Sequence, residues 1–242
     1  MIFDTIERLD QYVDDTDETD TNEQVLIRSI RTAIKLKEKG INKGDIISTC
    51  THNHKNSCVP LAASCFIGAI PANFDPDLSH LDTIHLLKLV QPKILFVSTQ
   101  SLPLMEKCLI EANVATELVV FGTSKKYSQF SEYLEPRDQE TNFRVTPIYD
   151  DRETAVILFS SGTTGLPKGI CLSHYSLVTQ AREGDYFLTK ISDERDIHLV
   201  YTTFYWITAL LTFIATVHDG GARVVCAKFD PFNCWKMIEK YK

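Results

Sequence analysis

Short β-rich runs alternate with helix-length segments through the first half of this chain, and this alternation limits the folds open to it. Apolar and β-branched runs predict strands at Ile46–Cys50, Ile70–Phe74, Lys93–Val97 and Leu118–Phe121. The intervening segments with helical length and patterning are Val59–Ala69, Leu81–Val90 and Leu102–Ala112. This order is typical of parallel strands joined by crossover helices. The sequence therefore predicts a doubly wound α/β fold, with a mostly parallel sheet and helices on both faces.

The flanking segments fit one large unit of this class. Apolar residues spaced three and four apart predict an amphipathic helix over Glu23–Lys39, which Gly40 ends. The acidic stretch Asp14–Asp20 has no apolar anchor and is expected to be a solvated loop. Gly122–Tyr149 is polar with weak periodicity, which predicts irregular structure rather than a domain boundary.

Composition excludes several function classes. The 242 residues carry a formal net charge of −7, which gives no basic surface for nucleic acid. The longest apolar run, Phe204–Val217, is interrupted by threonines and is shorter than a membrane span, so it predicts a buried helix. Asp4 and Glu7 stand where a secretory signal would carry positive charge and an apolar run. We expect no nucleic-acid partner, no membrane span and no secretion.

The cysteines indicate a reducing compartment. There are seven, an odd number, and none forms a Cys-x-x-Cys pair, which favours free, mostly buried thiols. Cys171 is likewise expected to be a buried structural thiol rather than a nucleophile, because no base is identifiable beside it. The last residues are Tyr241 and Lys242, so the Ser-Lys-Leu peroxisomal address is absent from this terminus. Cytosol and peroxisome both stay open.

One segment points to phosphate chemistry. The apolar run Ala155–Phe159 leads directly into Ser160–Gly169, which reads SSGTTGLPKG. Its glycines allow the backbone to turn with positive φ and to bring several N–H groups onto one anion. The hydroxyls add donors and Lys168 adds a positive charge. Gly165 and Lys168 are separated by Leu166 and Pro167, so the spacing is not that of the P-loop of kinases and GTPases. The segment predicts a polyphosphate site of another kind, the alternative being an ordinary Ser/Gly/Thr surface loop.

This segment resembles the phosphate loop of the adenylate-forming superfamily, which includes acyl-CoA synthetases, 4-coumarate-CoA ligase and firefly luciferase. An upstream segment, from Lys43 to Pro76, is similar to the same family. The residues in register there are Gly44, Asp45, Asn53, Pro60, Gly68, Ala69 and Pro76. The resemblance continues through His174, which is expected to pack or cap, and reaches Gly220–Val225.

The resemblance implies an enzyme that activates a carboxylic acid, expected to be a fatty acid, with ATP. The acid displaces pyrophosphate to give an acyl-adenylate, and coenzyme A then displaces AMP. The implied phosphate-binding residues are Ser160, Ser161, Gly162, Thr163, Thr164, Gly165 and Lys168. Thr164 and Lys168 would act in catalysis, with Thr164 also near Mg²⁺. Such donors would stabilise the charge that develops on leaving pyrophosphate.

The chain also departs from the family. Relatives carry a Pro-Phe-His-His-type segment lining the acyl pocket, and the matching residues here are Thr203, Phe204, Tyr205 and Trp206. Phe204, Tyr205 and Trp206 could form an aromatic wall for an acyl chain or belong to the core, and the histidine is missing. The downstream adenine, ribose and hinge segments, and the small C-terminal domain with its catalytic lysine, do not occur before Lys242.

Residues 1–242 are therefore expected to form the N-terminal part of an AMP-binding domain, without the small C-terminal domain. The leading reading is an acid-thiol ligase whose full activity this chain lacks. The alternative is a non-catalytic truncated isoform or pseudoenzyme that binds or regulates, and a third is an unrelated phosphate-binding α/β protein. His52 and His54 flank Asn53 but have no carboxylate or cysteine cluster nearby, so a metal site there is disfavoured. Oligomeric state stays open.

Overall fold

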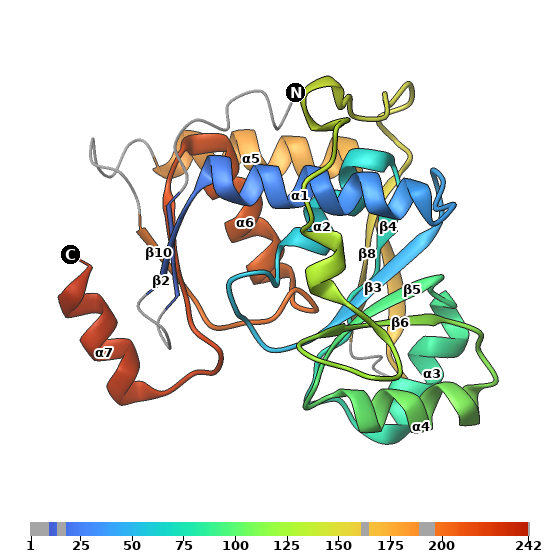
Figure 1. Ribbon diagram of the computed structural model, residues 1–242. Coiled ribbons are helices and arrows are strands. Elements are labelled where there is room, and N and C mark those ends of the chain that lie inside the picture. Colours follow the sequence, from blue (N-terminus) through green and yellow to red (C-terminus); the bar gives the residue numbers. More distant parts are fainter. Residues whose placement is uncertain (1–9, 14–17, 161–164, 189–196, 242) are drawn as a thin grey trace.

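The computed structural model describes residues 10–13, 18–160, 165–188 and 197–241. Its strands form three sheets, and helices cover the faces between and outside them (Figure 1). The predicted α/β class with helices on both faces of a parallel sheet is confirmed. The division into separate sheets is not visible in the sequence, because strand pairing is decided by tertiary contacts.

A five-stranded parallel sheet holds the first half of the chain, in the order β4-β3-β5-β6-β7. Its strands are β3 (Ile46–Cys50), β4 (Ile70–Pro71), β5 (Ile94–Ser98), β6 (Glu117–Phe121) and β7 (Ser128–Gln129). The second predicted strand, Ile70–Phe74, is shortened to β4, and Phe74 only bridges Cys50. Pro71 accounts for part of this, since a proline cannot donate a ladder hydrogen bond.

The helices of this unit begin and end where local signals place them. They are α1 (Asn22–Glu38), α2 (Val59–Ile67), α3 (His80–Val90) and α4 (Leu102–Ala112). Thr21 and Gln24 form a capping box at the start of α1, and Ser79 caps α3. Gly68 adopts left-handed φ 73° and ends α2 before Ala69, two residues earlier than predicted.

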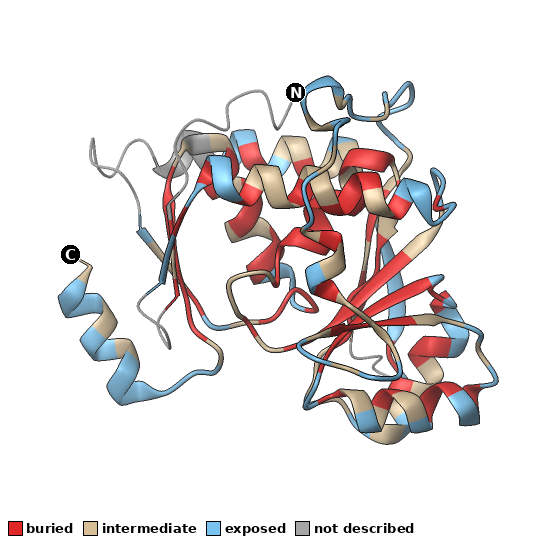
Figure 2. Ribbon diagram, viewed as in Figure 1, coloured by how far each residue is buried: buried red, intermediate tan, exposed pale blue. Residues whose placement is uncertain are grey.

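The central strand β5 is buried on both faces. Ile94 and Phe96 belong to a core that α1 and α2 cover, whereas Leu95 and Val97 belong to a second core under α3 and α4. Side chains alternate between faces along a strand, so an uninterrupted apolar run marks a strand with helices on both sides. Figure 2 shows this burial as red ribbon through the middle of the molecule, with exposed residues on its periphery.

A second sheet joins the two ends of the chain, in the order β10-β11-β1-β2. Its strands are β1 (Asp10–Val13), β2 (Glu18–Thr21), β10 (Ile197–Val200) and β11 (Ala222–Val225). All its pairs are parallel except β1 with β2. The prediction of a solvated loop over Asp14–Asp20 is wrong for its last residues. Asp20 lies in β2, is buried, and accepts two hydrogen bonds from Arg28, because an ion pair can replace the missing apolar anchor.

The third sheet is an antiparallel hairpin of β8 (Thr154–Ser160) and β9 (Lys168–Ser173). It leads into α5 (His174–Leu188), which packs beside α6 (Ile207–Asp219). The predicted buried helix is therefore present, but Phe204–Trp206 form the turn before it. Residues 122–149 are mainly irregular, as expected, apart from β7 and two short 3₁₀ helices at Phe130–Tyr133 and Glu140–Asn142.

The last helix, α7 (Pro231–Lys240), begins with an Asp230 cap followed by proline. None of its residues is buried, and Phe232 and Trp235 are 81% and 65% exposed. It projects beside the second sheet in Figure 1. Within the described ranges, no helix combines the length and apolarity needed to cross a membrane.

Candidate functional site

The glycine-rich segment connects the two strands of the hairpin. Ser160 ends β8 and is paired across the hairpin with Lys168, the first residue of β9. Ser161, Gly162, Thr163 and Thr164 lie outside the described residues, so their phosphate and metal contacts stay predictions. Gly165 has φ 132°, and no heavy atom lies within 4 Å of a Cβ added there. The backbone at Gly165 thus requires glycine and has open space beside it.

The outgoing arm of this loop is attached to the body of the protein. Pro167 is buried, and its carbonyl accepts a hydrogen bond from Nε2 of His85 on α3 at 2.9 Å. Lys168 is exposed, and no carboxylate among the described residues pairs with it. The hairpin therefore presents an exposed ammonium group, without a carboxylate partner in the described part of the chain, next to Ser160, and this arrangement can receive an anion.

Three aromatic rings connect the hairpin to its neighbours. Phe159 of β8 lies 5.8 Å from Tyr205 and 6.0 Å from Phe74, measured between ring centroids. Phe74 follows β4, and Tyr205 lies in the turn before α6. These contacts bring together the loop after β4, the hairpin and the turn before α6.

Asp75 organises this place and was not singled out by sequence reasoning. Its Oδ2 accepts hydrogen bonds from Thr203 Oγ1 and from Trp206 Nε1, both at 2.8 Å. The signal that could have found it is its position next to Pro76, inside the upstream segment of family resemblance. What the sequence could not supply was its partners, which lie more than a hundred residues away.

The three residues predicted to form an acyl wall have different surroundings. Phe204 is 7% exposed and packs edge-on against Phe213, so its ring lies in the core. Tyr205 is also buried, and burial raises the pKa of its phenol, with Asp75 and Asp82 adding to the rise. Trp206 is 52% exposed. Tyr205 and Trp206 are thus the members of this set that lie beside Asp75 and the hairpin.

Asn53 joins the two larger sheets. It is buried just beyond β3, and its Nδ2 donates to the carbonyls of Thr202 at 3.0 Å and Cys226 at 3.2 Å. These carbonyls follow β10 and β11. Asn53, one of the residues that resemble the family, therefore has a structural role. It links β3 to the turn that carries Tyr205 and Trp206.

The sequence analysis also made predictions for His174 and the cysteines, and one of them is wrong. His174 is half-buried at the start of α5, and burial lowers its pKa. The prediction that Cys171 is buried is wrong: it is exposed on β9, since this strand pairs only with β8 and leaves one face to solvent. The other six cysteines are buried or half-buried.

A thiol, an imidazole and a carboxylate line up on α3 and α4, which sequence spacing did not reveal. Cys108 Sγ lies 3.2 Å from His80 Nδ1, and His80 Nε2 lies 2.9 Å from Glu111 Oε2. Cys108 is 0% exposed, and burial, followed by the charge of Glu111, raises the pKa of its thiol. A nucleophile needs a thiolate and access to substrate, so this line is structural.

Comparison with known proteins supports the resemblance seen in the sequence. A sequence profile described as AMP-binding enzyme matches residues 8–242. A probable 4-coumarate–CoA ligase 1 from Dictyostelium discoideum is 26% identical, over 88% of this chain and 41% of its own length. A luciferin 4-monooxygenase from Photuris pensylvanica is 26% identical over 65% of this chain and 30% of its own.

Solved structures agree. The luciferase-like enzyme from the nonluminescent Zophobas morio mealworm superposes with a TM-score of 0.92 and 39% identity, over 99% of this chain and 56% of that one. ATP-bound MatB from Rhodopseudomonas palustris shares the fold, with a TM-score of 0.78 at 17% identity. The chain spans about half the length of these relatives or less. With nearly its whole length covered by the family profile, this chain belongs to the AMP-binding, adenylate-forming enzyme family.

Proposed function

We propose that this chain carries the nucleotide phosphate-binding half of an enzyme that activates a carboxylic acid, of the fatty acid class, with ATP and passes it to coenzyme A. The observation that carries the proposal is the open end of the hairpin. There, exposed Lys168 stands across from Ser160, and the backbone of Gly165 has open space beside it.

The reaction consists of two displacements. A carboxylate oxygen of the acid forms a bond to the α-phosphorus of ATP, and the bond from that phosphorus to the bridging oxygen breaks, which releases pyrophosphate. The sulfur of coenzyme A then forms a bond to the acyl carbon, its proton is lost, and AMP leaves. The first step generates charge on pyrophosphate, so donors already in place at the phosphates would accelerate it.

The proposed roles follow from position along the loop. The ammonium of Lys168 would neutralise charge on the phosphates. Ser160, with Ser161 and Thr163, would donate hydrogen bonds, and Gly162 and Gly165 would let backbone N–H groups approach. Thr164 would lie near Mg²⁺, whose chemistry when bound is to screen phosphate charge. The exposed ammonium, which no described carboxylate pairs with, and the open space at Gly165 fit such a ligand.

Trp206 stands where relatives have histidine, and its chemistry differs. An indole has one N–H donor and no basic nitrogen, and here that donor is already bonded to Asp75. The proposed first step does not need a base, because a carboxylic acid is already ionised at neutral pH. In this proposal the first step is accelerated by stabilisation of charge on the phosphates, and Tyr205 and Trp206 only form an apolar surface for the acid.

A second function, nucleotide binding without catalysis, is favoured by one observation. The segment Thr203–Trp206, which resembles the Pro-Phe-His-His-type segment of the family, contains no histidine. The protein would then retain phosphate contacts without the chemistry of the first step.

One experiment separates these functions. Acid-dependent exchange of labelled pyrophosphate into ATP is measured with the 242-residue chain, Mg²⁺, and matched panels of fatty and aromatic acids. Exchange with the fatty panel, lost in Lys168→Ala, is the result expected of the enzyme. Exchange confined to the aromatic panel would correct the substrate class.

ATP binding is measured on the same samples by calorimetry. Saturable ATP binding without exchange would establish the non-catalytic function. Exchange that is unchanged in Lys168→Ala would overturn the proposed role of the loop, and absence of both exchange and ATP binding in a folded protein would overturn both functions.

A further inference from the structure

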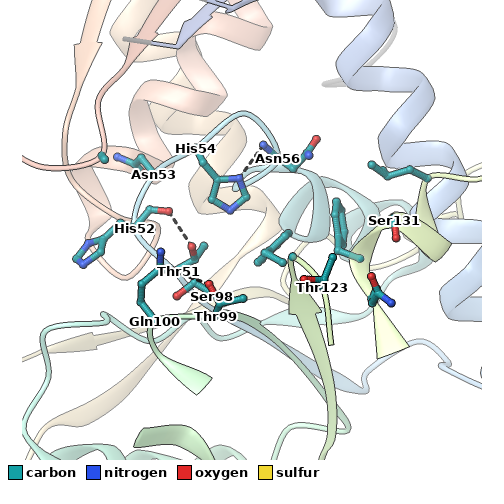
Figure 3. Close-up of a pocket in the computed structure, with 16 residues that line it drawn as sticks. Thr51, His52, Asn53, His54, Asn56, Ser98, Thr99, Gln100, Thr123 and Ser131 are labelled. Atoms are coloured by element: carbon teal, nitrogen blue, oxygen red, sulfur yellow. Dashed lines mark hydrogen bonds between the residues drawn. The ribbon is translucent and has the colours of Figure 1, made fainter. Parts of the chain in front are cut away.

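A cavity of about 700 Å³ opens at the carboxyl edge of the five-stranded sheet (Figure 3). Its wall is formed by residues that follow β3, β5 and β6, by the segment around Phe130, and by Ala227 beyond β11. The hairpin contributes none of the described residues that line it. The described residues thus form this cavity without the hairpin, and the inference drawn from it does not rest on the proposed function.

The topology of the sheet explains why a crevice forms there. The chain enters the sheet at β3, crosses to β4 on one side, and returns to β5 on the other side of β3. After β3 the chain continues into α2, which covers one face of the sheet. After β5 it continues into α4, which covers the opposite face. The connections that follow these two neighbouring strands therefore diverge. In open parallel sheets, ligands bind at such a reversal of strand order. Thr51 and Ser98, which come from the ends of β3 and β5, both line the cavity.

The lining is polar but almost without charge. None of the sixteen described lining residues is an aspartate, glutamate, lysine or arginine. Most carry hydroxyl or amide groups, while Phe121, Phe130 and Leu134 supply an apolar side. An ion entering such a cavity would lose hydration without gaining an opposite charge, which disfavours charged ligands.

His54 places one unsatisfied donor in this wall. Its Nδ1 accepts a hydrogen bond from the backbone N–H of Asn56 at 3.2 Å, so the proton of the neutral ring resides on Nε2. Nε2 is buried and has no hydrogen-bond partner among the residues that the structure describes, and the same holds for Oδ1 of Asn56. Phe121 packs edge-on against the imidazole with 4.6 Å between centroids. In Figure 3 the ring lies between Asn56 and the side chains at the ends of β5 and β6. Buried polar groups normally have a partner, so a missing one suggests that a ligand supplies it.

We propose that this cavity binds an uncharged, planar aromatic molecule bearing an amide, whose carbonyl accepts the Nε2 hydrogen bond of His54. The amide N–H₂ would be available to Asn56, and the ring would pack against Phe121 and Phe130. A volume of this size suits a ligand larger than a single ring. Ordered water is the competing occupant, since it also satisfies isolated buried donors.

The test uses three probes that share one ring and differ in charge: benzamide, benzoate and benzylammonium. Their affinities for the 242-residue chain are measured by ligand-observed NMR, and the Nε2 signal of ¹⁵N-histidine-labelled protein is followed during each titration. Benzamide is expected to bind and to shift the His54 Nε2 signal, and the two ions are expected to bind at least tenfold more weakly.

Variants locate the site. His54→Phe keeps a ring but removes the donor, and should weaken benzamide binding about tenfold. His54→Gln places an amide N–H near the position of Nε2 and should stay within about threefold of the parent. Trp206→Ala, at the proposed acyl surface, should leave benzamide affinity unchanged.

Three results would overturn the proposal. The first is the absence of benzamide binding, which would assign the cavity to water. The second is binding that is insensitive to His54→Phe together with an unmoved Nε2 signal. The third is equal affinity for the three probes, which would indicate non-specific binding.

Discussion

The indole N–H of Trp206 donates to the carboxylate of Asp75 at 2.8 Å, across the junction between the turn before α6 and the loop after β4. Thr203 donates to the same oxygen. One carboxylate therefore ties both Thr203 and Trp206 to the loop after β4. The turn that carries the proposed acyl surface is thus also a structural junction.

Replacing Asp75 by alanine should destabilise the protein. The change leaves the Thr203 hydroxyl and the Trp206 indole without their shared charged acceptor, and should lower the free energy of unfolding by about 2 kcal/mol. Urea unfolding followed by tryptophan fluorescence measures this. Asp77→Ala is the matched control, because Asp77 is 64% exposed and its pair with Lys228 is solvated, so its loss should be below about 0.5 kcal/mol. Equal losses of unfolding free energy in the two variants would show that the hydrogen bonds to Asp75 do not stabilise the fold.

Asn53→Ala should be more damaging than a typical surface change. It removes the two hydrogen bonds that Asn53 donates to the carbonyls of Thr202 and Cys226 at the junction of the sheets, which should cost about 3 kcal/mol of unfolding free energy. The control is Asn42→Ala, whose side chain is exposed. Chemical denaturation of both variants decides the point, and similar midpoints would contradict the assigned role.

Lys168→Ala should separate binding from folding. The side chain is exposed and unpaired among the described residues, so the melting temperature should change by less than about 2 °C. ATP and pyrophosphate affinity should fall about tenfold, since a charge-assisted contact is lost. Calorimetric titration measures the affinity, with Lys88→Ala on the exposed side of α3 as the control. A loss of affinity in both variants would point to general electrostatics.

Acid should destabilise the protein through His54. Burial lowers the pKa of His54 from 6.5 to about 4. Between these values the unfolded chain binds a proton that the folded protein does not, so the unfolding free energy falls as pH drops from 6.5 toward 4, by up to ~3 kcal/mol. Denaturation across this range, compared with His54→Gln, isolates the contribution. If the unfolding free energies of the parent and of His54→Gln change with pH in parallel, His54 is not the source of the acid destabilisation.

Thiol reactivity should follow exposure. Cys171 is exposed and should be alkylated first by iodoacetamide at pH 7. Burial raises the pKa values of Cys50 and Cys65 to about 12, so these thiols should react only on unfolding. Peptide mass spectrometry of a short labelling reaction ranks the sites, and Cys171→Ser should remove the fast phase. Early labelling of Cys108 would mean that α3 and α4 open locally.

Local sequence accounts for the elements whose signals lie within a few residues. The β-branched run Ile46–Cys50 and the segment Leu102–Ala112 form a strand and a helix with the predicted bounds. Ser160 and Lys168 border the glycine-rich loop on opposite strands of a hairpin, a position consistent with the phosphate site inferred from residue order, although the pairing itself was not foreseen. In these segments propensity, capping and pattern agree, so no distant contact is needed to choose the structure.

Tertiary structure decided what depends on partners distant in the chain. Asp20 is buried because Arg28 pairs with it, Cys171 is exposed because β9 has one neighbour, and Phe204 lies in the core while Trp206 meets Asp75. The cavity beside His54 also depends on strand order, which no local pattern encodes. Local propensities act over a turn or a strand, whereas burial and hydrogen-bond partners are set by which segments the fold brings together.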